Sequence, residues 1–282
     1  VLEQAPTVTV FLPEPAVPLR GRYPVVYLLG VGPQAAQAAQ QALARAQHKA
    51  ILVGVQTEEK AWNDPQKIST FFGRELLPYI ELNYPTIDHP TARGVAAQGA
   101  AYSKALAALL QCKDTFARAA VLDGGETPVS LAGASAQLRM WVGGTRAQAL
   151  VWQQTLLEQG SSYGPGFVLS LTEGQTLPGA LDLDYLFAPA AELKVKKLRG
   201  EVFPEAVSLS AQERATLALH AQLSGGKQFD YVPLTLKLSP MYLQWDVATG
   251  TLHPLSGAQP GKVKISAQVD KAVFKDKIKL KK

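Results

Sequence analysis

The hydrophobic and polar positions of the first two-thirds of the chain alternate between two kinds of segment. Short apolar runs bounded by Gly or Pro predict strands buried on both faces, and apolar residues at helical spacing between them predict helices. The predicted strands are 7–12, 23–29, 50–55, 94–97, 119–122, 138–142 and 167–171. The predicted helices are 34–47, 68–82, 103–110 and 146–158. Strands separated by helices indicate an α/β fold, with a mostly parallel sheet and helices on both faces.

After about residue 188 the pattern changes to period two. Residues 216–223 place every second side chain on one apolar face, which favours a strand over the helix that Ser210 and Glu213 could begin as a capping box. Further alternating segments are 231–238, 241–246, 262–269 and 272–280. Short strands without intervening helices predict an all-β sandwich. We therefore expect two domains, residues 1–189 and residues 190–282.

Length and composition agree with two folded domains. The 282 residues exceed what one hydrophobic core usually organises, and 47% hydrophobic with 18% charged residues excludes a disordered chain. No apolar run is long enough for a transmembrane helix. Cys112 has no second cysteine to pair with, and His48, His89, His220 and His253 lack metal-ligand spacing. We expect neither a metal nor a cofactor.

The positive charge is concentrated at one end of the chain. Residues 191–282 contain 15 Lys and Arg against 8 Asp and Glu, whereas the preceding 190 residues contain 13 against 15. The basic character therefore belongs to the predicted β-domain.

Residues 5–175 resemble a known family. The run YPVVYLL, the run ILVGV, the segment FFGRELLPYIELNYPT (71–86) and Arg93-Gly94-Val95-Ala96 are similar to the esterase family of α/β-hydrolases, which includes esterase D-like enzymes, feruloyl esterases and mycolyltransferases. The resemblance implies a nucleophile elbow, G-x-S-x-G, after the strand that begins near Arg93. The chain reads Ala97-Gln98-Gly99-Ala100-Ala101 there, which puts Gly99 at the serine position.

The resemblance also implies a catalytic acid and a catalytic histidine. Ala147 falls at the acid position and Gln175 at the histidine position, and no histidine occurs between His89 and His220. The three triad positions are thus replaced, and this predicts a domain without esterase activity. Ser103 is the nearby hydroxyl, which we interpret mainly as a serine at the start of a helix.

Four residues are candidates for a residual cleft at the former active site: Gly30, Trp62, Gln98 and Asp123. Gly30 falls at the position of the oxyanion loop, and Trp62 in the loop before the long helix. Asp123, with Glu126, follows a strand end, where it could bind a cation or a sugar hydroxyl, although a solvated turn is the simpler interpretation. An exposed tryptophan at a domain contact would explain Trp62 equally well.

Residues 194–282 resemble a bacterial Ig-like domain of group 2, through the phrase GTLHPLSGAQPGKVKISA. Such modules are spacers and adhesion units of envelope or secreted proteins. Lysines project at period two from the last two predicted strands: Lys262, Lys264, Lys275, Lys277, Lys279 and Lys281. A solvated face with charged edge strands is one interpretation, and a cationic strip for anionic envelope polymers or lipid headgroups is the other. The absence of interleaved aromatic residues argues against nucleic acid.

Together these observations predict a catalytically inactive esterase-like protein that acts as a binding or structural component of the bacterial cell envelope. Its expected partner is an envelope protein, a glycan or an anionic surface, in an extracytoplasmic location. The chain starts at Val1 without a signal segment, which agrees with a removed leader or a shortened chain. Two alternatives stay open: a carboxylesterase or acyltransferase with an unconventional nucleophile, and a carbohydrate-binding protein that uses the vacated cleft.

Overall fold

The computed structural model describes residues 5–13, 21–112, 115–125, 130–171 and 174–282. The chain divides into two compact units. The first comprises Val1–Ser162 with Ser170–Ala188, and the second Tyr163–Leu169 with Pro189–Lys282. The strand β7 (Phe167–Leu171) is therefore divided between the units, which the sequence pattern does not indicate.

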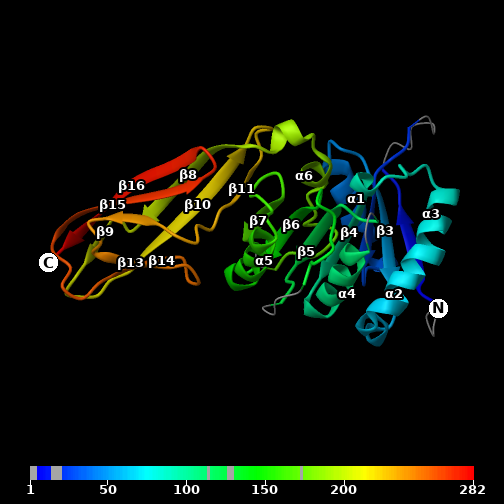
Figure 1. Cartoon of the computed structure of the whole chain (residues 1–282), viewed down its shortest axis with the longest axis horizontal. Coiled ribbons are helices and arrows are strands. Elements are labelled where there is room, and N and C mark those ends of the chain that lie inside the picture. Colours follow the sequence, from blue (N-terminus) through cyan, green and yellow to red (C-terminus); the bar gives the residue numbers. More distant parts are fainter. Residues whose placement is uncertain (1–4, 14–20, 113–114, 126–129, 172–173) are drawn as a thin grey trace. The chain divides into compact units, whose positions relative to one another are not determined.

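The first unit is built on a mostly parallel sheet (Figure 1). Its strands are, in spatial order, β1 (Thr7–Phe11), β3 (Ile51–Gln56), β2 (Val25–Leu29), β4 (Arg93–Gln98), β5 (Arg118–Leu122) and β6 (Arg139–Gly144). Only β1 runs antiparallel to its neighbour among these described strands. All five residues of β2 are buried, as the continuous apolar run predicted for a strand covered on both faces.

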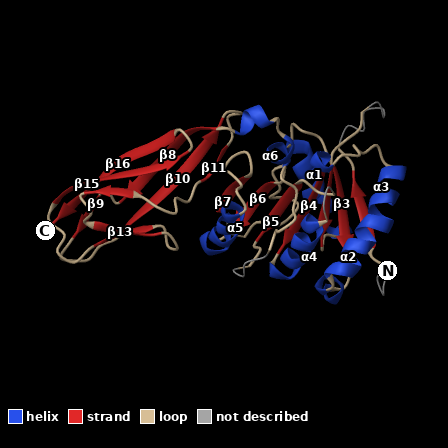
Figure 2. Ribbon diagram, in the orientation of Figure 1, coloured by secondary structure: helices blue, strands red, loops and turns tan. Residues whose placement is uncertain are grey.

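Helices lie on both sides of this sheet (Figure 2). The longer ones are α1 (Ala36–Arg45), α2 (Pro65–Phe71), α3 (Leu77–Asn83), α4 (Ala100–Gln111) and α5 (Arg146–Glu158), and α6 (Leu183–Phe187) is short. The predicted helix 68–82 corresponds to α2 and α3 joined by the π-helical turn Phe72–Leu76. Pro78 follows that turn, where a missing N–H disfavours regular α-helical bonding.

The strand order reverses between β2 and β4. From β2 the chain crosses to β3 on one side and then returns past β2 to β4 on the other side. Because crossovers between parallel strands are right-handed, α1 and the α2–α3 segment cover opposite faces. Ligand sites of open α/β sheets form at the carboxyl ends of the strands beside such a reversal. The turns after β2 and β4 are therefore the place to look for a site.

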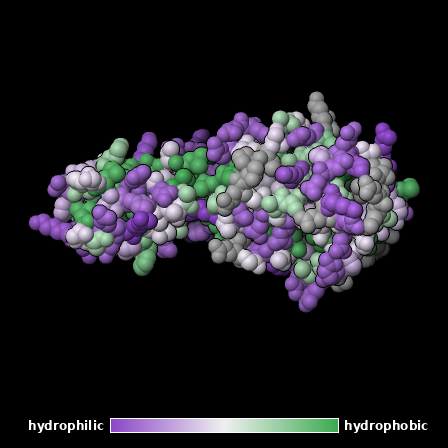
Figure 3. Space-filling view, turned by 90° about the horizontal axis from the view of Figure 1, so that it is seen from below, coloured by the Kyte–Doolittle hydropathy of each residue, from purple (hydrophilic) through white to green (hydrophobic). Residues whose placement is uncertain are grey.

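The second unit consists of two sheets. One contains β7, β11 (Gln228–Asp230), β10 (Ala215–Leu223), β14 (Thr251–Pro254) and β13 (Leu243–Asp246) in this order, with β8 (Val195–Phe203) also paired to β10. The other contains β12 (Lys237–Ser239), β15 (Gly261–Val269), β16 (Ala272–Lys281) and β9 (Ala206–Ser208). Alternate side chains of β10, β15 and β16 are buried, as period two predicted. Hydrophilic side chains are interspersed with hydrophobic ones on the face shown in Figure 3.

Several details of the second unit differ from the sequence prediction, which also lacks the short strands β9, β11 and β14. The predicted strand 231–238 is wrong over most of its length, because only Lys237 and Leu238 lie in β12. Pro233 interrupts this segment, and a proline has no N–H to donate to a ladder. The nine-residue β8 was not predicted, since only Leu198 and Val202 of its residues are buried and the alternation is weak.

No helix in the described ranges is long and apolar enough to cross a membrane.

Candidate functional site: the turn between β4 and α4

Gly99 forms the turn between β4 and α4. Its backbone has φ +87° and ψ +158°, and its N–H donates to the carbonyl of Leu122 at 2.8 Å. A positive φ is strained for any residue with a Cβ, and the strand–turn–helix of a nucleophile elbow imposes such strain on its central residue. Apart from its chain neighbours, no heavy atom of the described residues lies within 4 Å of the place that a Cβ would take. The turn thus follows the strand–turn–helix course of an elbow with open space above it, but its φ and ψ lie in a region that essentially only glycine adopts, and Gly99 supplies no hydroxyl.

Ser103 lies one helical turn further on and faces inward. Its side chain is 1% exposed, and its Oγ donates to the Gly99 carbonyl at 3.0 Å. This bond from a serine to the carbonyl four residues earlier is a common way to satisfy a hydroxyl inside a helix. Ser103 is therefore a buried helical serine of α4 rather than an exposed nucleophile.

Gln98 joins the turn to the loop that carries Gln175. The Nε2 of Gln98 donates to the carbonyl of Gln175 at 3.1 Å, and its Oε1 accepts from the N–H of Leu177 at 2.8 Å. Gln98 therefore uses both ends of its amide to fasten this loop beside the elbow, while Gln175 itself is exposed. Two of the three predicted triad positions, Gly99 and Gln175, are thus brought to the same place.

Asp123 lies at the end of β5, with a positive φ of 51°. Its N–H donates to the carbonyl of Gly143 at 3.1 Å, and a Cβ at Gly144 would lie 3.0 Å from its Oδ1. The carboxylate is thus close to the start of α5, where a negative charge is favourable. Ala147 is exposed in the first turn of that helix. Glu126, which we considered with Asp123, lies outside the described residues.

An aromatic pair fills the space behind the loop after β2. A Cβ at Gly30, whose φ is +76°, would lie 2.6 Å from Cζ of Tyr102, and the ring of Trp62 meets that of Tyr102 edge-on at 5.6 Å. Trp62 is 2% exposed, so the interpretation of an exposed tryptophan is wrong. Tyr102 was not among the sequence candidates, because its contact with Gly30 joins α4 to the loop after β2 and no local pattern reveals it.

The histidines of the first unit lie at the other edge of the sheet. His48 precedes β3 and His89 precedes β4, whereas Gly99 follows β4. The six residues of β4 separate the two edges, roughly 20 Å at about 3.3 Å per residue. In the second unit, His220 pairs with Asp230 at 3.1 Å and His253 contacts Thr251 at 2.7 Å. Neither His48 nor His89 can serve the turn at Gly99 as a base.

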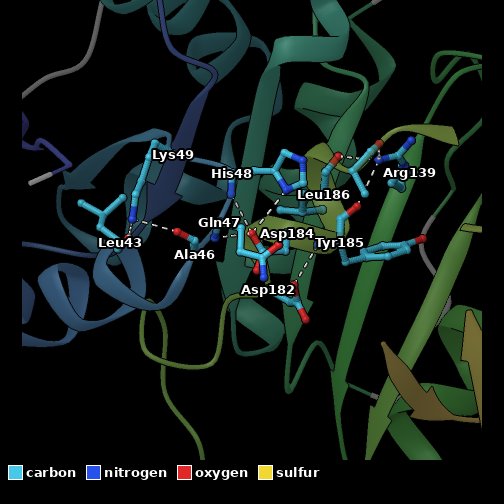
Figure 4. A network of polar contacts seen from close by, with 11 residues as sticks. Leu43, Ala46, Gln47, His48, Lys49, Arg139, Asp182, Asp184, Tyr185 and Leu186 are labelled. Carbon is cyan, nitrogen blue, oxygen red and sulfur yellow. Dashed lines mark hydrogen bonds and ion pairs between the residues drawn. The ribbon is translucent and has the colours of Figure 1, made fainter. Parts of the chain in front are cut away.

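His48 instead belongs to a polar network that fastens α6 (Figure 4). The Oδ1 of Asp184 accepts from the backbone N–H groups of Gln47 and His48 at 2.7 and 2.8 Å and lies 3.4 Å from Nδ1 of His48. These contacts join the loop before β3 to α6. These contacts satisfy backbone N–H groups at the edge of the sheet opposite to the turn at Gly99. They therefore give His48 a structural role.

Arg139 completes the attachment of α6. Its Nη1 donates to the carbonyls of Tyr185, Leu186 and Ala188 at 3.0, 2.9 and 2.8 Å, which are the orphan carbonyls at the end of the helix. Arg118 lies opposite Arg139 on β5. Burial, and secondarily the charge of Arg139, lowers the pKa of Arg118 to about 10. Both guanidinium groups are structural.

A mostly parallel sheet covered by helices, with a strained turn from strand to helix beside the reversal of strand order, defines an α/β-hydrolase-like fold. Within this class the chain belongs to the family described as "Putative esterase", whose model matches residues 1–166. No curated protein matches the chain.

Several solved structures are similar to the chain. A ferulic acid esterase has 20% sequence identity and a TM-score of 0.46, with 62% of this chain and 86% of that chain covered. The enterobactin esterase of Shigella flexneri has 15% identity and a TM-score of 0.42, with 59% and 50% covered. The fluorophosphonate-binding serine hydrolase F of Staphylococcus aureus has 12% identity and a TM-score of 0.41, with 60% and 85% covered.

Proposed function

We propose that this chain is a non-catalytic member of the esterase family that serves as a binding or structural component of the bacterial cell envelope. The observation that carries the proposal is Gly99, which occupies the strained turn between β4 and α4 with free space above it and no hydroxyl. An acyl group cannot be transferred to a side chain that is absent.

The partners of a nucleophile are missing in the same way. Gln175, at the histidine position, has a side-chain amide that neither gains nor loses a proton near neutral pH. Ala147, at the acid position, cannot orient a base. Restoring one of the three groups would leave the other two roles empty, because a nucleophile, its base and the group that orients the base act as a unit.

The two alternative functions have less support. An acyltransferase that uses Ser103 would need its Oγ free and close to a base, but this oxygen is buried and bonded to the Gly99 carbonyl. A carbohydrate site would gain most from an exposed aromatic ring, and Trp62 is buried. Asp123 is the remaining polar candidate.

The envelope location rests on the second unit. Its two packed sheets of short strands agree with the resemblance to a bacterial Ig-like domain, and such domains occur on envelope and secreted proteins. An extracytoplasmic location follows from this resemblance.

Hydrolysis of short p-nitrophenyl esters by the purified chain tests the absence of catalysis. We expect no turnover above buffer for the wild type, for Gly99→Ser or for its matched control Gly99→Ala, which has the same backbone strain without a hydroxyl. Turnover in the wild type that is abolished by Ser103→Ala, with folding of the variant verified by circular dichroism, would contradict the proposal.

Cell fractionation tests the location separately. A tagged copy expressed from its own gene in the source organism should be recovered with the envelope or the secreted fraction. Recovery with the cytosolic fraction alone would overturn the envelope role and leave the result of the esterase assay untouched.

A further inference from the structure

Seven lysines share the outer face of the sheet β12-β15-β16-β9. We call this surface the lysine face; its members are Lys237, Lys262, Lys264, Lys275, Lys277, Lys279 and Lys281. All seven are exposed, while the alternate residues of β15 and β16 are mostly buried against the other sheet. The remaining outward residues of these strands are small, polar or aliphatic: Ala206, Ser208, Ser239, Ser266, Gln268 and Val273.

Two pairs of these lysines are directly opposite each other. Lys262 is paired in register with Lys279, and Lys264 with Lys277. Like charges at such positions repel, because their Cβ atoms are only about 5 Å apart. Within the described part of the chain none of the seven lysines forms an ion pair, and the acidic residues of the hairpin lie elsewhere: Asp276 alternates with the lysines at an inward position, and Asp270 is in the turn.

Protection of sheet edges explains only part of this pattern. Lysines that prevent edge-to-edge association are needed on edge strands. Here β15 and β16 are the two inner strands of the sheet, but β12 pairs only with residues 264–266 of β15 and β9 only with residues 279–281 of β16. Lys264 and Lys279 therefore have a paired strand on both sides. The interpretation of charged edge strands, made from the sequence, therefore does not account for Lys264 and Lys279.

The outer face of the other sheet has a different composition. There Lys197, Arg199 and Glu201 occupy alternate positions on the same face of β8. His220 on β10 lies opposite Arg199 and contacts Asp230. Positive and negative groups are thus mixed on one sheet, while the lysine face has one sign only. A general need for solubility would not distinguish the two faces.

We propose that the lysine face docks on an anionic lipid bilayer. Its charges form a two-dimensional array, spaced about 6.7 Å along each strand and about 4.8 Å between strands. The face carries no aromatic side chain to stack on a base or a sugar. Lipids diffuse within their plane, so anionic headgroups can gather beneath every lysine, whereas a linear polymer would follow only one row. An approaching bilayer also relieves the repulsion between the opposed lysines.

This inference deepens the proposed envelope role by naming the partner surface, and its test is independent of the esterase assay. The full chain is sedimented with vesicles of phosphatidylcholine alone and with vesicles containing phosphatidylglycerol. We expect binding to the second kind only, weakened as salt rises, because the attraction is screened.

The decisive comparison uses two double variants. Lys264→Gln/Lys277→Gln removes one opposed pair of the lysine face, and Lys197→Gln/Arg199→Gln removes two charges from the other sheet. Since a lysine near an anionic surface contributes roughly fivefold to partitioning, the first variant should bind about 30-fold more weakly. The control should bind almost as tightly as the wild type.

Three results would overturn the inference. One is the absence of binding to phosphatidylglycerol vesicles at low salt. Another is equal weakening of both double variants, which would show that net charge alone decides. The third is binding to soluble polyphosphate without binding to vesicles, which would assign the face to a linear polyanion. None of these results would bear on whether the first unit hydrolyses esters.

Discussion

The hydroxyl of Tyr27 gives a sharp test of how the first unit is held together. Tyr27 lies on β2 with 0% exposure, and its ring meets the rings of Phe72 and Phe116 edge-on at 5.7 and 5.9 Å. Its hydroxyl oxygen has no hydrogen-bond partner among the described residues. Tyr27→Phe keeps the ring and removes only the buried polar atom.

The expected effect is a gain of about 1 kcal/mol in the free energy of unfolding at pH 7. A buried hydroxyl without a partner costs about 1–3 kcal/mol in proteins, and the small void left by one oxygen offsets part of the gain. Urea unfolding followed by tryptophan fluorescence measures it, because Trp62, Trp141 and Trp152 are in the first unit. The midpoint should rise at an unchanged slope.

The difference between variant and wild type should grow at alkaline pH. Burial, followed by the charge of Glu81, raises the pKa of Tyr27 well above its ordinary value of 10.0. Below pH 10 the hydroxyl is protonated in both states and adds no pH dependence. Above pH 10 only the unfolded chain releases this proton. The free energy of unfolding of the wild type therefore falls by about 1.4 kcal/mol per pH unit through this group, whereas that of Tyr27→Phe does not. A variant less stable by more than about 1 kcal/mol, or a difference constant up to pH 11, would refute this reasoning.

Three further predictions concern other parts of the chain. Arg139→Met should lower the free energy of unfolding by about 3 kcal/mol in urea titrations, because three helix-end carbonyls lose their donor; a loss below about 1 kcal/mol would contradict this. Gln98→Ala should speed hydrogen exchange at the amide of Leu177, because that N–H loses its acceptor. Gln98→Glu keeps the acceptor oxygen and should preserve the protection of this amide. Equal exchange rates in the two variants would argue against the hydrogen bond between Gln98 and Leu177. Lys264→Gln should raise the melting temperature in low salt by relieving repulsion from Lys277, and no change, or a fall, would speak against that repulsion.

Much of the architecture could be predicted from local patterns. The apolar run that became β2 is buried along its whole length, since a strand between two helical layers needs no polar face. The alternation in β10, β15 and β16 was equally informative, because one face of each strand packs inward. The strand β8 was missed because only two of its side chains are buried, so its alternation is weak. The break at Pro233 was missed because a single proline ends a strand without altering the alternation of the residues around it.

The candidate site was predictable only in part. The presence of a glycine at the turn after β4 could be read from the sequence, because Gly99 comes shortly after the predicted strand 94–97. The clamp from Gln98 to the loop of Gln175 could not, because the two residues are 77 positions apart and meet only when the sheet is assembled. The burial of Trp62 under Tyr102 depends on the same assembly.

The sequence by itself determined the alternation of strands and helices, the change to period two and the absence of a side-chain hydroxyl at Gly99. These are properties of local spacing and residue type, and they do not depend on which strands become neighbours. Tertiary structure decided the rest: the reversal of strand order beside Gly99, the distance of His48 and His89 from it, and the gathering of seven lysines on one face. Strand order and register bring residues distant in sequence together, and no local period encodes them.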